Sequence, residues 1–213
     1  MGKVDEKRNV PSILRRCLAV DAYLTNVFVK NIERFLPLRQ LKVHYQVLEY
    51  SCHGIIWLAG LLAFIWILNK RDLYQMQVNL MLALVLDILV IAVLKATTRR
   101  RRPRENTDPL CMGPDKYSFP SGHASRSAMI VYFFFNLWPV SVVFIPPLLA
   151  WTTSICLSRL LMRRHHLLDV AAGVIVGILE GMFIGLIYLE PATCANLISW
   201  LSDEKLPGAE YDV

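Results

Sequence analysis

The chain carries three polar stretches at the edges of long apolar runs: KATTRRRRP (Lys95–Pro103), PSGHASR (Pro120–Arg126) and SRLLMRRHHLLD (Ser158–Asp169). Together they hold a cluster of cations, two separated histidines and a carboxylate four residues after one of them. Fixed cations stabilise the charge on a transferring phosphoryl group, and histidines can serve as nucleophile or general acid. The three stretches therefore predict phosphoryl-transfer chemistry at a membrane surface.

The composition favours a membrane protein. Of the 213 residues, 55% are hydrophobic and 19% are charged, which is typical of multi-span membrane proteins rather than of water-soluble domains. The length suits one domain. We divide the chain into a disordered basic N-terminus (1–11), an amphipathic, interfacial helical segment (12–50), a transmembrane domain that carries the three stretches (51–190) and an acidic C-terminal tail (191–213).

The apolar runs predict an all-α fold, a multi-span transmembrane helical bundle with about five spans and an N-terminal amphipathic helix. The spans are expected at Gly54–Leu68, Val78–Leu94, Gly122–Trp138, Pro139–Leu161 and Leu167–Leu189. A span needs roughly 20 apolar residues, so the first run must be extended at its start to cross a bilayer. In the fourth span, Pro146 and Pro147 either kink the helix or mark its real start.

The N-terminal segment reads as one amphipathic helix. From Ser12 to Leu36 the apolar residues recur at helical spacing, and the basic residues fall largely off the apolar stripe. Such a helix can lie in the membrane interface, with its axis in the plane of the bilayer. Packing of the same helix on the domain's own core is an equally good interpretation.

Alternation of five spans would bring all three polar stretches to the membrane face that also carries the N-terminus. Most of the basic residues lie on that face, so the positive-inside rule predicts that it is cytosolic. Basic runs also raise nucleic acid as a partner. Because these runs border apolar segments, anionic membrane lipids or a phosphorylated substrate are the better prediction, and we expect no nucleic acid.

Two acidic residues, Asp87 and Glu180, fall within predicted spans. A charge in the apolar part of a bilayer is costly, so each should face a partner helix or water. A hydrogen bond to a neighbouring helix is the favoured interpretation, and a role in a substrate path is the alternative.

A ladder of small residues marks one face of the last predicted span: Gly173, Gly177, Gly181 and Gly185. Small residues four apart allow two helices to approach closely. The partner helix is expected either within the bundle or in a second copy of the chain, so this face predicts a homo-oligomer as one of two outcomes.

The cysteines suggest no covalent or metal framework. The chain has five, an odd number, and they show neither a CxxC motif nor the spacing of metal ligands. We therefore expect no disulfide framework.

His165 and Asp169 are four residues apart at the start of the last predicted span. On a helix they would share a face, and the carboxylate would accept a hydrogen bond from the imidazole. That contact would fix the tautomer and leave the second ring nitrogen as a nucleophile. The spacing therefore predicts a His–Asp pair.

A second imidazole, His123, follows Pro120-Ser121-Gly122, which resembles a helix start with free backbone N–H groups. Gly122 would let the backbone approach a phosphate closely, and Ser121 would donate a hydrogen bond to it. His123 is then placed to act as general acid.

Cations for the phosphate can come from each remaining stretch. Lys95, Arg102 and Arg159 are the candidates, with Arg suited to bidentate contact and Lys to a point charge. Taken singly, each has a plainer interpretation, such as a basic anchor at a helix end. Taken together, three independent stretches on one face are hard to explain without a site.

In order, the stretches resemble the signature of the type 2 phosphatidic acid phosphatase superfamily: Lys-x6-Arg-Pro, Pro-Ser-Gly-His and Ser-Arg-x5-His-x3-Asp. Every specified position is filled here, and the register selects Arg102 from the Arg run and His165 from the His pair. The resemblance implies a helical bundle and hydrolysis through a phosphohistidine, with no metal and no cofactor. It makes His165 the nucleophile, Asp169 its orienting partner and His123 the acid and base. The phosphate ligands that it implies are Lys95, Arg102, Ser121, Gly122 and Arg159.

The flanking sequence DKYSFPSGHASR (Asp115–Arg126) is similar to the polyisoprenoid diphosphate phosphatase branch, which includes presqualene diphosphate phosphatase. That resemblance implies an isoprenoid lipid phosphate as substrate, at the endoplasmic reticulum or nuclear envelope. Two alternatives stay open. One is a broad lipid phosphate phosphatase acting on phosphatidate, lysophosphatidate or sphingosine 1-phosphate. The other is a catalytically silent membrane scaffold with the same fold.

Overall fold

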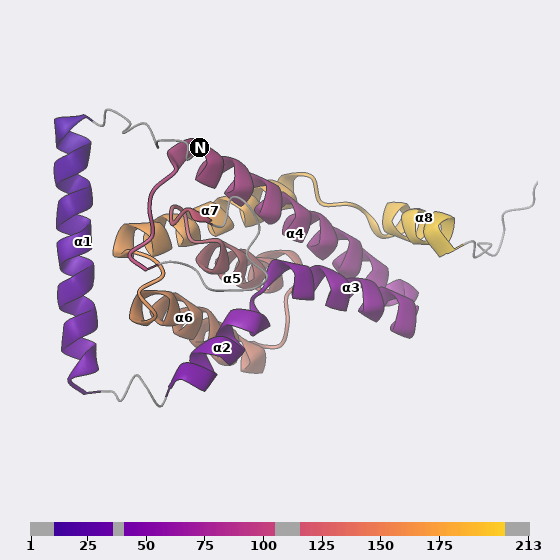
Figure 1. Cartoon of the computed structure of the whole chain (residues 1–213). Coiled ribbons are helices and arrows are strands. Elements are labelled where there is room, and N and C mark those ends of the chain that lie inside the picture. Colours follow the sequence, from indigo (N-terminus) through magenta and orange to yellow (C-terminus); the bar gives the residue numbers. More distant parts are fainter. Residues whose placement is uncertain (1–10, 36–40, 105–115, 203–213) are drawn as a thin grey trace, which may run out of the picture.

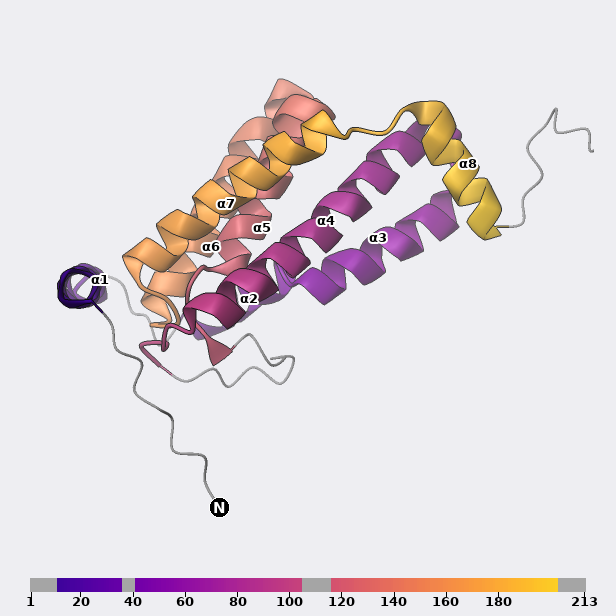
Figure 2. The same ribbon diagram turned by 90° about the horizontal axis from the view of Figure 1, so that it is seen from above.

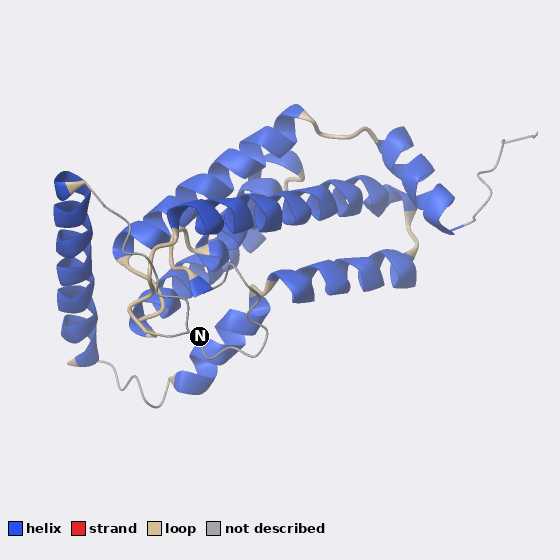
Figure 3. Ribbon diagram, turned by 45° about the horizontal axis from the view of Figure 1, so that its top comes forward, coloured by secondary structure: helices blue, strands red, loops and turns tan. Residues whose placement is uncertain are grey.

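A computed structural model describes residues 11–35, 41–104 and 116–202, and this part of the chain is a bundle of helices (Figures 1 and 3). The α-helices are α1 (Ser12–Glu33), α2 (Lys42–Ser51), α3 (Gly54–Leu68), α4 (Arg71–Thr98), α5 (Gly122–Tyr132), α6 (Ile145–Leu161), α7 (Leu167–Leu186) and α8 (Pro191–Ser202). The all-α prediction is confirmed.

Three helical segments among the described residues are long and apolar enough to cross a membrane: Arg71–Thr98, Val142–Leu161 and Leu167–Leu186. A fourth results if α2 and α3, which meet at 55°, form one bent span. The chain is therefore a multi-span membrane bundle, and the count of five spans stays a prediction. α5 has only 11 residues and continues through a π-helical turn at Phe133–Leu137.

The proline pair in the fourth predicted span marks a helix start. α6 begins at Ile145, with Pro146 and Pro147 in its first turn. Proline is tolerated there because the first N–H groups of a helix have no intrahelical partner. A short 3-10 turn at Val142–Phe144 precedes the helix and carries the apolar segment back toward Pro139.

α5 lies in the middle of the bundle, against α4, α6 and α7. All its residues from Ala124 to Ile130 are buried, and Met129 packs with Leu84 and Ile184 in the main apolar cluster. Because it is covered on several sides, α5 holds its first residues, which include His123, in a fixed place.

The glycine ladder of α7 faces α5. A Cβ atom added at Gly173 would lie 2.5 Å from the carbonyl oxygen of Ser121, and one at Gly177 would lie 2.0 Å from that of Ser125. One at Gly181 would meet the ring of Tyr132 at 2.5 Å. The close approach is therefore made by a helix of the same chain, which is the first of the two predicted outcomes, and a homo-oligomer is not shown.

Both intramembrane carboxylates face partner helices, as the favoured interpretation predicted. Asp87 on α4 forms an ion pair with Arg126 on α5, with 2.6 Å between the nearest atoms. Glu180 on α7 accepts a hydrogen bond from the hydroxyl of Ser125, also on α5, over 3.2 Å. These contacts tie three helices together in the interior of the bundle.

α1 lies across one end of the bundle. It is seen side-on in Figure 1 and end-on in Figure 2, where the other long helices run in the plane of the view. It contacts α6 and α7 and is not among the segments apolar enough to span. This orientation agrees with a helix in the membrane interface whose inner side rests on the bundle.

The C-terminal region starts with a helix that the sequence analysis did not assign. α8 packs against α4 and forms a small apolar cluster in which Cys194 and Ile198 contact Tyr74. The side chain of Asn79 forms hydrogen bonds with both the N–H and the carbonyl of Leu189, and so fixes the segment that leads from α7 to α8. The acidic residues of the predicted tail follow Ser202 and lie outside the described residues, as does most of the predicted disordered N-terminus.

Candidate active site

The three polar stretches meet at one end of the bundle. Lys95 lies at the end of α4, His123 at the start of α5, Arg159 near the end of α6 and His165 in the turn before α7. The charges of Lys95 and Arg159 act on both imidazoles, and His165 acts on His123. The predicted gathering of these residues is therefore observed.

The backbone of the arginine run decides which of its side chains face the site. Arg101 forms an isolated antiparallel bridge with Tyr117, so successive side chains point to opposite sides. Arg100 and Arg102 turn inward to the site, whereas Arg99 and Arg101 are exposed. The guanidinium of Arg102 donates toward Nε2 of His165 over 3.3 Å.

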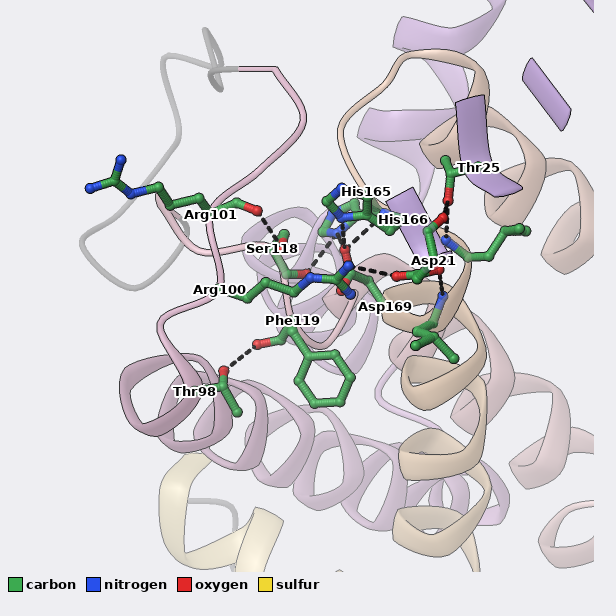
Figure 4. Close-up of polar contacts among 12 residues, drawn as sticks. Asp21, Thr25, Thr98, Arg100, Arg101, Ser118, Phe119, His165, His166 and Asp169 are labelled. Atoms are coloured by element: carbon green, nitrogen blue, oxygen red, sulfur yellow. Dashed lines mark hydrogen bonds and ion pairs between the residues drawn. The ribbon is translucent and has the colours of Figure 1, made fainter. Parts of the chain in front are cut away.

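His165 is held in one tautomer. Its Nδ1–H donates to the backbone carbonyl oxygen of Ser118 over 2.8 Å (Figure 4). This leaves a lone pair on Nε2, which lies beside Arg102. Burial, followed by the positive charges of Arg102, Lys95 and Arg159, holds the pKa of His165 well below its ordinary value of 6.5. The ring is thus neutral at physiological pH, which is the state that a nucleophilic nitrogen requires.

Asp169 does not make the predicted hydrogen bond to His165. Its carboxylate lies 3.9 Å from Nδ1 of His165 and instead accepts from the backbone N–H of His166 over 2.8 Å and from Arg100 over 2.6 Å. The reason is local: α7 begins at Leu167 with His166 as its N-cap, so His165 precedes the helix and the four-residue spacing does not place the pair on one face.

Ser121 and Gly122 form the start of α5, as predicted. The N–H of Ser121 donates to the carbonyl of Asp169 over 2.9 Å. The hydroxyl of Ser121 is buried and has no hydrogen-bond partner among the described residues. A Cβ added at Gly122 would lie 3.2 Å from the side chain of Ile91, which is a tight contact.

Glu49 contacts three residues of the site region. Nε2 of His123 donates to the backbone carbonyl of Glu49 over 3.2 Å. The buried guanidinium of Arg159 pairs with the carboxylate of Glu49 over 2.9 Å, and Arg164 lies 3.6 Å from the same oxygen. Glu49 therefore occupies the position of a counter-anion to Arg159.

Sequence reasoning missed Ser118, Glu49, Arg100 and Asp21. Ser118 acts chiefly through backbone groups, since its N–H also donates to the carbonyl of Arg100, and such contacts leave no side-chain signature. Arg100 could not be told from its neighbours. The available signal lay in Asp21 and Glu49, which are acidic residues in segments rich in basic and apolar residues.

The comparisons with known proteins agree with this geometry. Residues 76–190 match the PAP2 superfamily. The chain is 31% identical over 193 residues to "Probable lipid phosphate phosphatase beta" of Arabidopsis thaliana, over 78% of this chain and 87% of that protein. Its fold is similar to that of LpxE from Aquifex aeolicus, with a TM-score of 0.53 and 22% identity over 68% of this chain and 85% of the other.

A second solved structure shares the fold: the transmembrane PAP2 type phosphatidylglycerolphosphate phosphatase of Bacillus subtilis. The TM-score is 0.58 and the identity is 19%, over 81% of this chain and 86% of the other. At these identities the two structures speak for the fold, whereas the match over residues 76–190 covers more than half of the chain and includes every predicted site residue. The chain therefore belongs to the PAP2 superfamily, and it is a membrane phosphatase.

Proposed function

We propose that this protein removes phosphate from polyisoprenoid lipids, namely farnesyl, geranylgeranyl and presqualene diphosphates and the matching monophosphates, through a phosphohistidine and without a metal ion. The observation that carries the chemistry is the state of His165. A neutral imidazole, fixed by the carbonyl of Ser118, presents its Nε2 lone pair next to Arg102. This is the arrangement of a nucleophile beside a group that binds the transferring phosphoryl.

In the first half-reaction Nε2 of His165 attacks phosphorus, and the bond between phosphorus and the leaving oxygen breaks. The leaving oxygen belongs to the lipid alcohol or to its monophosphate. His123 supplies a proton to that oxygen, and Lys95, Arg102 and Arg159 stabilise the negative charge on the phosphoryl oxygens. The buried hydroxyl of Ser121, which has no partner among the described residues, donates to one of them.

In the second half-reaction water attacks the phosphohistidine, and His123 accepts the proton of the water. The bond from phosphorus to Nε2 breaks, so that inorganic phosphate leaves and His165 returns to its neutral form. His123 donates to the backbone carbonyl of Glu49, and the Glu49 carboxylate pairs with Arg159. Binding of an anion to Arg159 therefore competes with the Glu49 carboxylate.

An apolar pocket of about 420 Å³ supports the proposal that the substrate has an isoprenoid tail. This volume falls within the range of about 300–1,000 Å³ that is common for ligand sites. Its walls include Ile56, Trp57, Leu61, Phe64, Met76 and Phe134. Ser51 also lines the pocket and directly precedes Cys52, whose thiol contacts the carbonyl of His123. A tail in this pocket would thus start close to the catalytic end of α5.

A broad lipid phosphate phosphatase is the second candidate. It is favoured by the Arabidopsis thaliana relative, whose name gives a lipid phosphate as substrate. Phosphatidate, lysophosphatidate and sphingosine 1-phosphate would present the same phosphate to the same cations, and only the tail would differ.

We further propose that the protein lies in the endoplasmic reticulum membrane or nuclear envelope, with its active site and N-terminus in the cytosol. The charge distribution supports this orientation, because the Arg run and the basic residues of α1 lie at the site end of the bundle. Cys17 on α1 is exposed and can report it. In a Cys111→Ser protein, an impermeant maleimide should label Cys17 in intact microsomes, and protection would contradict a cytosolic site.

The purified protein in detergent with EDTA provides the decisive assay. Farnesyl or presqualene diphosphate would compete with phosphatidate, and His165→Ala is the control. EDTA-resistant release that depends on His165 and favours the isoprenoid supports both mechanism and substrate. Release that favours phosphatidate moves the substrate to the second candidate. Release from His165→Ala at the wild-type rate contradicts the mechanism, and no release from any of these lipids favours the scaffold alternative.

A further inference from the structure

α1 sends polar side chains into the start of α7. The hydroxyl of Thr25 accepts from the backbone N–H of Leu167 over 3.1 Å, and Oδ1 of Asp21 accepts from that of Leu168 over 3.1 Å. Both side chains are buried, and both lie beside the site in Figure 4. The first N–H groups of a helix have no partner within it, so α7 takes its first two partners from a helix far away in the sequence.

The same aspartate reaches the site by a second route. Arg100 donates to Oδ2 of Asp21 and to Oδ1 of Asp169, each over 2.6 Å. Asp169 in turn accepts from the N–H of His166, the residue next to His165. Hydrogen bonds to charged groups are stronger and more directional than neutral ones. Asp21 is therefore connected to the turn that carries His165 both through the helix start and through Arg100.

α1 turns two of its polar residues inward. Asp21 and Thr25 are buried against the bundle, whereas Ile13, Val20 and Tyr23 are more than half exposed. In a helix on the surface of a water-soluble domain the apolar side faces the protein. Here the buried side of α1 includes the polar side chains of Asp21 and Thr25, and both bind the start of α7.

We propose that Asp21 and Thr25 are positioning residues of the phosphatase and that α1 is a part of its active site. They hold the start of α7, and through Arg100 they also hold Asp169. The turn that carries His165 is thereby kept where Nδ1 of His165 can donate to the carbonyl of Ser118. Neither residue touches the phosphate. This inference rests on the role proposed for His165 and is independent of which lipid is the substrate.

Two variants separate the two routes. Asp21→Asn keeps an oxygen for Leu168 and loses the ion pair with Arg100. Thr25→Val keeps the shape of the side chain and loses the acceptor for Leu167. In each, kcat should fall on the order of 10- to 100-fold, since displacement of a reacting group by about 1 Å costs about a hundredfold. KM should stay near the wild-type value, because Lys95, Arg102 and Arg159 are untouched.

Glu33→Gln is the matched control. Glu33 also lies on α1 and pairs with Arg163 in the turn before α7, over 3.1 Å, but this pair is exposed and binds no group of α7. It should keep the wild-type kcat. Thr25→Ser restores an acceptor and should recover most of the activity lost in Thr25→Val. Elution and melting temperature in detergent show that each variant is folded.

The kinetics decide the matter for any lipid phosphate that the wild-type protein hydrolyses. Values of kcat for Asp21→Asn and Thr25→Val equal to that of Glu33→Gln would overturn the inference. So would losses that appear in KM alone. If Asp21→Asn aggregates, Thr25→Val and Thr25→Ser decide alone. Full activity of His165→Ala would instead refute the proposed nucleophile, which is a different result from equal kcat values in the α1 variants.

Discussion

Nδ1 of His165 lies 2.8 Å from the backbone carbonyl oxygen of Ser118 and donates its hydrogen to it. A carbonyl oxygen accepts hydrogen bonds and never donates them, so this contact admits only a protonated Nδ1. The backbone at Ser118, next to the Pro120–Arg126 stretch, thereby leaves Nε2 of His165 as the nitrogen that is free to react. A main-chain contact of this kind survives any substitution of the Ser118 side chain that leaves the backbone in place.

Acidification should destabilise the protein through His165. Its folded-state pKa lies well below the ordinary value of 6.5, so the unfolded chain binds a proton that the native state refuses. The stabilisation is complete above pH 6.5 and is lost as the pH falls toward the folded-state pKa. The melting temperature of the detergent-solubilised protein should therefore fall from about pH 7.5 to about pH 5.5, and less steeply in His165→Asn. Equal slopes in the two proteins would contradict the depressed pKa.

Ser121→Ala should weaken phosphate binding without weakening the fold. The hydroxyl is buried with no partner among the described residues, so its removal breaks no hydrogen bond that they show, and the melting temperature should be equal or higher. KM for a lipid phosphate should rise. Ser125→Ala is the comparison, because it removes the hydrogen bond that Ser125 donates to Glu180. This loss should cost about 1–3 kcal/mol of stability. A melting temperature that falls equally in both variants would remove the basis for the role of Ser121.

Gly177→Ala should destabilise the bundle strongly. The new Cβ would lie 2.0 Å from the carbonyl oxygen of Ser125, a backbone atom that cannot move aside. Forcing α5 and α7 apart should cost about 1–3 kcal/mol or more. Gly60→Ala is the matched control, because an added Cβ there meets nothing within 4 Å and alanine favours a helix. Thermal unfolding in detergent measures both, and a tolerated Gly177→Ala would refute the close approach.

Glu49→Gln should lower stability and strengthen the response to an anion. The amide leaves the buried Arg159 without its counter-charge, at a cost of about 1–3 kcal/mol, because the amide oxygen still accepts a hydrogen bond. Orthovanadate, which resembles a bound phosphoryl group, should raise the melting temperature of this variant more than that of the wild type. An equal rise would show that Arg159 does not meet the anion.

The gathering of the site was predictable, because helix ends alternate between two faces of a membrane. Lys95, Arg159 and His165 end up together as their places along the apolar runs require. The details that depend on a single residue of helix phase were not predictable. α7 starts two residues after His165, and this shift alone turns a predicted His165–Asp169 hydrogen bond into a separation of 3.9 Å.

Long-range polar contacts also escaped prediction. The sequence analysis gave Asp21 and Glu49 no role, yet each meets an arginine more than 75 positions away in the sequence. Periodicity shows which side of a helix is apolar and says nothing about which tertiary partner a buried charge will find. The glycine ladder had the same ambiguity, since spacing shows a close approach but not the chain that makes it.

The seam between α5 and α7 has a consequence for how a lipid reaches the site. Backbone atoms of α5 fill the places where side chains of α7 would begin, so these two helices form one rigid block that carries both His123 and Asp169. The access route for a tail cannot pass between them. The chain bends by 55° between α2 and α3, and Ser51, at the end of α2, borders the apolar pocket. A lipid that enters sideways from the bilayer would therefore pass this bend, while α5 and α7 stay in place.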